Sequence, residues 1–326
     1  MRKLNQLIFV ILLSHYSFTL WAFDIIAHRG ASGFLPEHTK EALVLSYMQG
    51  ADYIEQDLVA TKDEQLIVLH DIHLETVTNV ELLYPSRKRS DGRYYVIDFT
   101  LKELRRLQVH ERTDANGKRV FPERYAGSGY FSIATFEEHI ELIKELNKRF
   151  GTNTGFYPEI KSPEFHLSEG IDITKITLDV LNKHGLNSRE ANIYVQCFYP
   201  PSLKRIRQEF KSKVKLVQLL AENDWQESSA NYDALKSQQG IEEVAQYADG
   251  IGPWLPQIFE DGHGKPKALL NYAKAAQLTI HPYTYRQDAL FGNMSDEAYF
   301  NRIRSSGVDG LFTDHILPFM KLDKVP

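Results

Sequence analysis

The stretch "DYIEQDLVATKDEQLIVLHD", residues 52–71, predicts a β-hairpin that carries acidic side chains. An apolar run that carries Glu55 and Asp57 is followed by the polar turn "ATKDEQ" and by a second apolar run that ends at His70. Residues two apart point to the same face of a strand, so the two carboxylates share a face. The polar turn is typical of a hairpin between antiparallel strands. Such a hairpin places Asp57 opposite Leu69 and brings His70 close to both acids.

Strand-like runs alternate with amphipathic helical segments over the rest of the chain. Besides the hairpin arm "LIVLH", eight runs have strand character: "DIIAH", "YIEQDLV", "GFYPEI", "IYVQCF", "KLVQLL", "DGIGPW", "TIHPYTY" and "GLFTD". Helical spacing of apolar residues follows several of them, as in residues 135–151 and 172–185, each of which ends at a glycine. This alternation predicts an α/β fold, a (β/α)8 TIM-type barrel formed by one domain over residues 23–326.

Residues 74–131 do not follow the alternation. They are rich in Gly, Ser, Arg and Tyr, and we interpret them as an insertion after the second strand and its hairpin, at the mouth of the barrel. The basic cluster at residues 87–93 is most simply a solvated loop. The sequence contains no internal repeat and no low-complexity tract.

The N-terminus and the composition restrict the class of protein. Arg2 and Lys3 precede an apolar run at residues 7–13, and Ala22 provides a small residue for cleavage. This pattern predicts a secretory signal over residues 1–22 that is removed on export. A membrane anchor is the alternative, but the run is shorter than the ~20 residues that cross a bilayer. The net charge of -5 provides no basic field for nucleic acid, and a single cysteine excludes an intramolecular disulfide.

Three carboxylates are expected to meet at the mouth of the barrel, because the C-terminal ends of its strands converge there. Glu55 and Asp57 come from the second strand, and Glu159 from "YPEIKSP". Clustered like charges repel unless a cation lies among them, and all-oxygen ligands suit a hard divalent ion, Ca²⁺ or Mg²⁺. The alternative is a set of salt bridges to Arg29 and Lys161.

Histidines and cations complete the predicted site. His28 and His70 lie at strand ends beside acids, where they can act as a base and an acid near neutral pH. Arg29 and Lys161 can hold the non-bridging oxygens of a phosphate. These residue types together suggest cleavage of a phosphodiester. Two aromatic side chains at later strand ends are candidates for a wall of the substrate site: Trp254 and Tyr283.

The motifs "AHRGASGFLPEHT", "YIEQDLVATKDEQLIVLHD", "YPEIKSP", "HPYTYR" and "GVDGLFTD" closely resemble the glycerophosphodiester phosphodiesterase family over essentially the whole mature chain. The resemblance is closest to the bacterial periplasmic branch. It implies a periplasmic, Ca²⁺-dependent barrel enzyme that hydrolyses deacylated phospholipids, such as glycerophosphocholine, to sn-glycerol 3-phosphate and an alcohol. The insertion at residues 74–131 resembles the segment that, in this family, covers the glycerol end of the substrate.

Carried over residue by residue, the resemblance assigns roles to the same positions. It implies catalytic roles for His28 and His70. We assign His28 as the base and His70 as the acid, and the sequence leaves the reverse assignment open. It implies metal ligands and phosphate contacts at five further residues: Glu55, Asp57 and Glu159 for the metal, Arg29 and Lys161 for the phosphate. In "PEHT", His38 stands where many family members have Asn, and we interpret it as a mark of the subgroup and not as a catalytic residue.

Two other functions remain alternatives. A phospholipase or a sphingomyelinase-D-like lyase would need an apolar, lipid-facing rim, which the polar 74–131 insertion does not provide. An exported binding protein could retain the barrel without catalysis, but the complete set of histidines, acids and cations disfavours it. The predicted partner is therefore a small-molecule glycerophosphodiester, with no nucleic acid and no membrane span after cleavage of the signal.

Overall fold

The computed structural model describes residues 23–262, 264–292 and 294–316. The predicted secretory signal at residues 1–22 lies outside the described residues. Within them, no helix has the length and the apolar character needed to cross a membrane.

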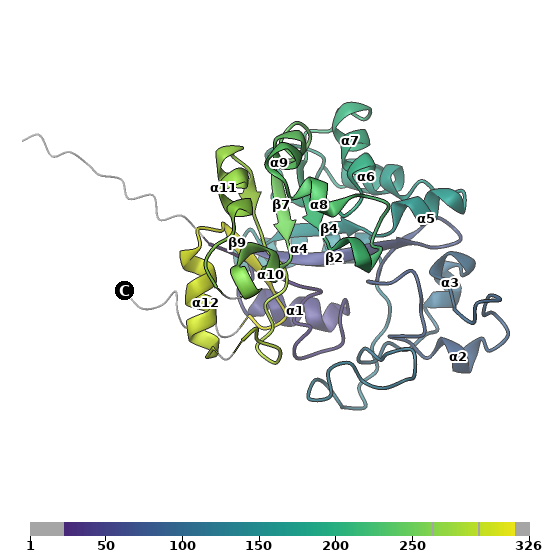
Figure 1. Cartoon of the computed structure of the whole chain (residues 1–326). Coiled ribbons are helices and arrows are strands. Elements are labelled where there is room, and N and C mark those ends of the chain that lie inside the picture. The colour runs from purple at the N-terminus through teal and green to yellow at the C-terminus, as the bar shows by residue number, and fades with distance from the viewer. Residues whose placement is uncertain (1–22, 263, 293, 317–326) are drawn as a thin grey trace, which may run out of the picture.

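Eight parallel strands of the described chain form a nearly closed barrel (Figure 1). Their bounds are β1 Asp24–Ala27, β2 Tyr53–Ala60, β4 Gly155–Ile160, β5 Tyr194–Cys197, β6 Lys215–Leu220, β7 Gly250–Pro253, β8 Thr279–Ile280 and β9 Gly310–Thr313. The strand order runs β8-β7-β6-β5-β4-β2-β1-β9. Backbone bonds close the circle between the ends of this order: the N–H of Phe312 donates to Pro282 O at 3.0 Å, and that of Tyr285 to Phe312 O at 2.8 Å. The predicted fold class is confirmed.

The hairpin forms as the sequence predicts. Strand β3, Leu66–Val68, pairs antiparallel with β2, and the N–H of Leu69 donates to Asp57 O at 2.9 Å. Asp57 is therefore opposite Leu69, and His70 follows immediately. All of β2 is buried, because β1 and β4 flank it and helices and the hairpin cover it. Burial is what gives its carboxylates unusual proton affinities.

Helices surround the barrel and bury the outward faces of the strands. The longer ones are α1 Lys40–Met48, α4 Phe136–Phe150, α6 Ile173–Lys183, α7 Pro200–Gln208, α9 Gln238–Val244, α11 Ala268–Ala275 and α12 Asp296–Ser305. The shorter ones are α5 Pro163–Ser168, α8 Tyr232–Leu235, α10 Leu255–Ile258 and the 3₁₀ turns Asn223–Trp225 and Glu260–Gly262. Helix α4 begins after a capping box formed by Thr135 and Glu138 and ends at Gly151 in the left-handed conformation, as its sequence predicts.

The interior of the barrel is packed and gives the site a solid floor. Ring and aliphatic side chains from the strands fill it: Ile26, Tyr53, Tyr157, Tyr194, Val217 and Phe312. Phe312 also lines the pocket above this layer. Cys197 is buried, and its thiol donates to Ile160 O. This packing confines substrate chemistry to the C-terminal ends of the strands.

The segment 74–131 forms a small lobe beside the barrel, around α2 and α3 in Figure 1. It contains α2 Val80–Leu83, a 3₁₀ turn at Val96–Asp98 and α3 Leu101–Leu104. Its apolar cluster is distinct from that between barrel and helices, and includes residues such as Val80, Phe99 and Leu107 packed with Ile67 of β3. In the basic cluster, Arg87 pairs with Glu103 and Arg89 with Asp98 and Glu169. These arginines are thus bound to carboxylates.

Candidate active site

A pocket of about 210 Å³ opens at the C-terminal ends of the barrel strands. Seven of the nine predicted site residues line it: His28, Arg29, Glu55, His70, Glu159, Trp254 and Tyr283. The other two, Asp57 and Lys161, are buried within the same group and contact its members. Convergence of the strand ends therefore assembles the predicted residues in one place.

The first part of the site is the pair of carboxylates on β2. The exposed fractions of Glu55 and Asp57 are only 2% and 1%. Burial and the adjacent Asp57 raise the pKa of Glu55 well above 4.5. Burial would also raise the pKa of Asp57, but Lys161 and a hydrogen bond from His38 hold it well below its usual range. The backbone N–H of Arg29, which is in the left-handed conformation, donates to Glu55 Oε2 at 2.6 Å.

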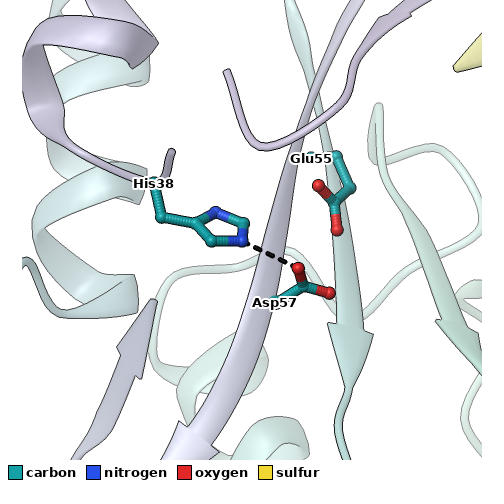
Figure 2. A group of neighbouring side chains, drawn as sticks. All are labelled: His38, Glu55 and Asp57. Atoms are coloured by element: carbon teal, nitrogen blue, oxygen red, sulfur yellow. Dashed lines mark hydrogen bonds and ion pairs between the residues drawn. The ribbon is translucent and has the colours of Figure 1, made fainter. Parts of the chain in front are cut away.

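His38 belongs to this group, although sequence reasoning excluded it from the catalytic set. Its Nε2 donates to Asp57 Oδ2 at 2.7 Å, as Figure 2 shows. The ligand atoms of His38, Glu55 and Asp57 all lie within 4.8 Å of one another. A tight turn before α1 gives His38 a φ of 62° and directs its ring inward. Thr39 is the N-cap residue of α1, so His38 lies in the turn directly before the helix. A capping threonine is the feature of the sequence that could have indicated this turn.

Glu159 joins the group through the register of β4, where it is paired with Asp57. Burial raises the pKa of Glu159 from 4.5 to about 8, although Lys161 opposes the shift. The ammonium of Lys161 lies 2.8 Å from Glu159 Oε1 and 3.4 Å from Nε2 of His70. The structure therefore contains both arrangements that the sequence allowed. The carboxylates form a cluster, and Lys161 forms a salt bridge with one of them.

This cluster has the features of a site for a hard divalent cation. One oxygen of Asp57, Oδ1, is fully buried and has no hydrogen-bond partner in the described part of the chain. Glu55 and Asp57 point toward one another in Figure 2, at a cost in electrostatic repulsion that a cation would remove. The donors available at the pocket are carboxylate oxygens, which suit Ca²⁺ or Mg²⁺.

Each of the two predicted catalytic histidines is oriented by an aspartate. Nδ1 of His28 donates to Asp314 Oδ1 at 2.6 Å, and Nδ1 of His70 donates to Asp71 Oδ1 at 2.5 Å. Burial and Arg29 lower the pKa of His28 from 6.5 to about 4. Burial, Arg29 and Lys161 lower the pKa of His70 to about 3. Both rings are thus neutral at pH 7, with the proton on Nδ1 and the lone pair on Nε2, which in His70 accepts from Lys161 Nζ at 3.4 Å.

Part of the pocket wall is aromatic. Trp254 contacts Trp225 edge to face, with 5.0 Å between ring centroids, and Phe198 contacts Tyr283 at 5.9 Å. The hydroxyl of Tyr283 donates to Leu220 O at 2.7 Å, so its ring is held in place. Sequence reasoning did not select several other lining residues: Gln196, Leu219, Trp225, Glu227, Thr284, Arg286 and Phe312.

Sequence comparisons identify one family, and structure comparisons find the same fold. The chain matches the Glycerophosphoryl diester phosphodiesterase family over residues 28–317. It is 42% identical to a glycerophosphodiester phosphodiesterase of Haemophilus influenzae, covering 89% of this chain and 86% of the relative. A glycerophosphodiester phosphodiesterase of Treponema pallidum is 36% identical, with 89% and 88% covered. A phosphodiesterase of Oleispira antarctica, solved in complex with the product sn-glycerol-3-phosphate, shares the fold with a TM-score of 0.64 at 19% identity, with 93% and 97% covered.

Proposed function

Because the chain belongs to the glycerophosphodiester phosphodiesterase family, we propose that this pocket hydrolyses glycerophosphodiesters to sn-glycerol 3-phosphate and an alcohol. The observation that carries the proposal is the pair of Asp-bound histidines beside a buried carboxylate cluster. Acid–base catalysis needs two proton-transfer groups at one pocket, and the two histidines can provide them. The carboxylates can bind a cation, whose positive charge would offset the negative charge of the phosphate. The Oleispira product is the same glycerol 3-phosphate that this reaction would release.

We propose that Glu55, Asp57 and Glu159 hold a Ca²⁺ ion, with Mg²⁺ as the alternative. Their oxygens fit both hard cations, and the resemblance to the periplasmic branch favours Ca²⁺. When bound, such an ion neutralises phosphate charge and polarises the phosphorus centre. His38 keeps Asp57 in position by donating to Oδ2, which leaves Oδ1 for the ion.

The chain's own residues then perform the proton transfers. Arg29 and Lys161, which lie beside the carboxylates, contact the non-bridging oxygens of the phosphate. Nε2 of His28 removes the proton from the nucleophile, which is either water or the glycerol 2-hydroxyl of the substrate. Nε2 of His70 gives a proton to the leaving alcohol. Because His70 is neutral in the free protein, it must first gain a proton, and the negative charge of the incoming phosphate favours that.

The aromatic wall suits a cationic head group. Rings of Trp225, Trp254 and Tyr283 face the pocket together with the carboxylate of Glu227. A quaternary ammonium is attracted both by the faces of aromatic rings and by a nearby carboxylate. We therefore propose choline and ethanolamine esters as preferred substrates, with the head group at this wall.

We also propose that the protein is exported to the periplasm after removal of residues 1–22. The basic Arg2 and Lys3, the apolar run and Ala22 support this proposal. N-terminal sequencing of the secreted form, together with cell fractionation, tests it. A mature chain that still begins at residue 1 would contradict it.

Release of sn-glycerol 3-phosphate from glycerophosphocholine tests the proposed reaction. The protein lacking residues 1–22 is assayed with Ca²⁺, with Mg²⁺ and with a chelator, beside a His70→Ala variant. We expect cation-dependent release that the variant loses. A folded protein that binds the cation but releases no product from any glycerophosphodiester would overturn the proposal and favour the binding-protein alternative.

A further inference from the structure

Two arginines of the 74–131 segment reach the aspartates that orient the two histidines. Nη1 of Arg112 donates to Asp71 Oδ2 at 2.6 Å. Nη2 of Arg124 donates to Asp314 Oδ2 at 2.7 Å. In both cases the other oxygen of the aspartate, Oδ1, accepts from Nδ1 of a histidine. The same arrangement of arginine, aspartate and histidine thus occurs twice at one pocket.

A second carboxylate holds each arginine in place. Arg112 binds Glu37 through Nε at 2.9 Å and Nη2 at 2.6 Å, and its side chain is only 14% exposed. Arg124 binds Asp288 through Nε at 2.8 Å and Nη2 at 3.1 Å, and its side chain is 4% exposed. Buried guanidinium groups that bind two carboxylates are fixed in direction, and a lysine cannot reproduce this geometry.

The shared aspartate explains how a distant arginine affects a histidine. A carboxylate that accepts from Nδ1 fixes both the ring orientation and the tautomer with Nε2 free. If the arginine is removed, the aspartate can rotate and can also draw the imidazole proton more strongly. None of the residues that line the pocket comes from 74–131, so these arginines act without touching the substrate there.

We propose that the 74–131 segment is a positioning element of the active site, in which Arg112 and Arg124 hold His70 and His28 in the orientation that proton transfer requires. The proposal rests on the acid–base roles proposed above for the histidines. It also predicts an order of effects. Asp314 has a second guanidinium partner, Arg286 at 2.9 Å, whereas Arg112 is the arginine bound to Asp71 among the described residues. Loss of Arg112 should therefore cost more than loss of Arg124.

Double-mutant cycles test the proposal. The variants are Arg112→Gln and Asp71→Asn, alone and combined, and Arg124→Gln and Asp314→Asn, alone and combined. Their kcat and KM for glycerophosphocholine are measured at saturating Ca²⁺. We expect each arginine variant to lower kcat by about 10–100-fold, as is typical when a partner of a site ligand is removed. Each double variant should be no slower than the slower of its single variants, because the arginine acts through the aspartate.

Arg87→Gln is the matched control, since Arg87 lies in the same segment and pairs with Glu103, which orients no histidine. It should keep the kcat of the unmodified protein. If Arg112→Gln does not fold, Arg112→Lys replaces it. The ammonium of a lysine cannot bind Asp71 and Glu37 in the same way as a guanidinium. Arg112→Lys can therefore be combined with Asp71→Asn in the same double-mutant cycle, with a smaller expected loss of kcat.

Unchanged kcat in both arginine variants would overturn the proposal. It would also be overturned if the loss of kcat in each double variant equalled the product of the losses in its two single variants. The variants His28→Ala and His70→Ala separate this failure from a failure of the proposed function. If the histidine variants are inactive and the arginine variants fully active, only the positioning role is wrong. If the histidine variants remain active, the acid–base roles themselves are wrong.

Discussion

Cation binding at the carboxylate cluster should release protons, because Glu159 is largely protonated before the cation binds. Burial raises the pKa of Glu159 to about 8, and burial with Asp57 raises the pKa of Glu55 well above 4.5. A carboxyl with a pKa of about 8 is roughly 90% protonated at pH 7. A divalent ion binds the ionised form. Glu159 should therefore release about one proton at pH 7.

The sign of the pH dependence follows from these pKa values. Each proton that must leave makes the apparent Ca²⁺ affinity increase by about tenfold per pH unit below the pKa of that carboxyl. The affinity should thus rise from pH 5 to pH 8 and level off above the pKa of Glu159. Isothermal titration calorimetry at pH 7, in buffers with different ionisation enthalpies, measures the number of protons directly.

Two variants check the assignment. Glu159→Gln should release about one proton fewer, since its side chain cannot ionise. Asp233→Asn changes an acid whose side chain is 71% exposed, and should leave the proton number unchanged. Ca²⁺ binding without proton release at pH 7, or with the same affinity from pH 5 to pH 8, would show that Glu159 is not a protonated ligand of the cation.

Three further predictions concern His38, Glu227 and Asp24. His38→Ala should weaken Ca²⁺ binding by about 10–100-fold, because Asp57 loses its positioning donor; unchanged affinity in calorimetry would contradict this. Glu227→Gln should lower kcat/KM for glycerophosphocholine about two- to fivefold and spare glycerophosphoglycerol; equal loss with both esters argues against a cationic head-group site. Burial and Asp52 raise the pKa of Asp24 from 3.8 to about 7, so the unfolded chain loses this proton first and stability falls as pH rises from about 4 to 7. Asp24→Asn should thus raise the free energy of unfolding at pH 7, by up to about 4 kcal/mol in urea unfolding, and a variant as pH-sensitive as the original would disprove the assignment.

The local patterns of the sequence were sufficient for the barrel and for most of the carboxylate cluster. Period-two alternation and the polar turn fix the hairpin, and the hairpin fixes the register of Asp57 and Leu69. The hydrogen bond between His28 and Asp314 could also have been predicted from the sequence. These residues follow directly after Ala27 and Thr313, which are paired between β1 and β9 once the barrel closes.

The arginines of 74–131 had no comparable signal. The segment has little regular structure, so its side chains have no period from which a direction can be inferred. The contact between Arg124 and Asp314 spans 190 residues, and that between Arg112 and Asp71 spans 41. His38 was missed for another reason: its direction depends on a left-handed backbone conformation in a tight turn, which non-glycine residues rarely adopt.

In the proposed mechanism, His28 and His70 act as a base and an acid on a phosphodiester. The most direct test compares His28→Ala and His70→Ala on glycerophosphocholine and on the 4-nitrophenyl ester of sn-glycerol 3-phosphate. Nitrophenolate leaves without a proton, so a general acid contributes little to its departure. We predict that His70→Ala loses about 10²–10⁴-fold in kcat/KM with the choline ester and almost nothing with the nitrophenyl ester, whereas His28→Ala loses heavily with both. Equal losses of kcat/KM in His70→Ala with the two esters would contradict the role of His70 as general acid.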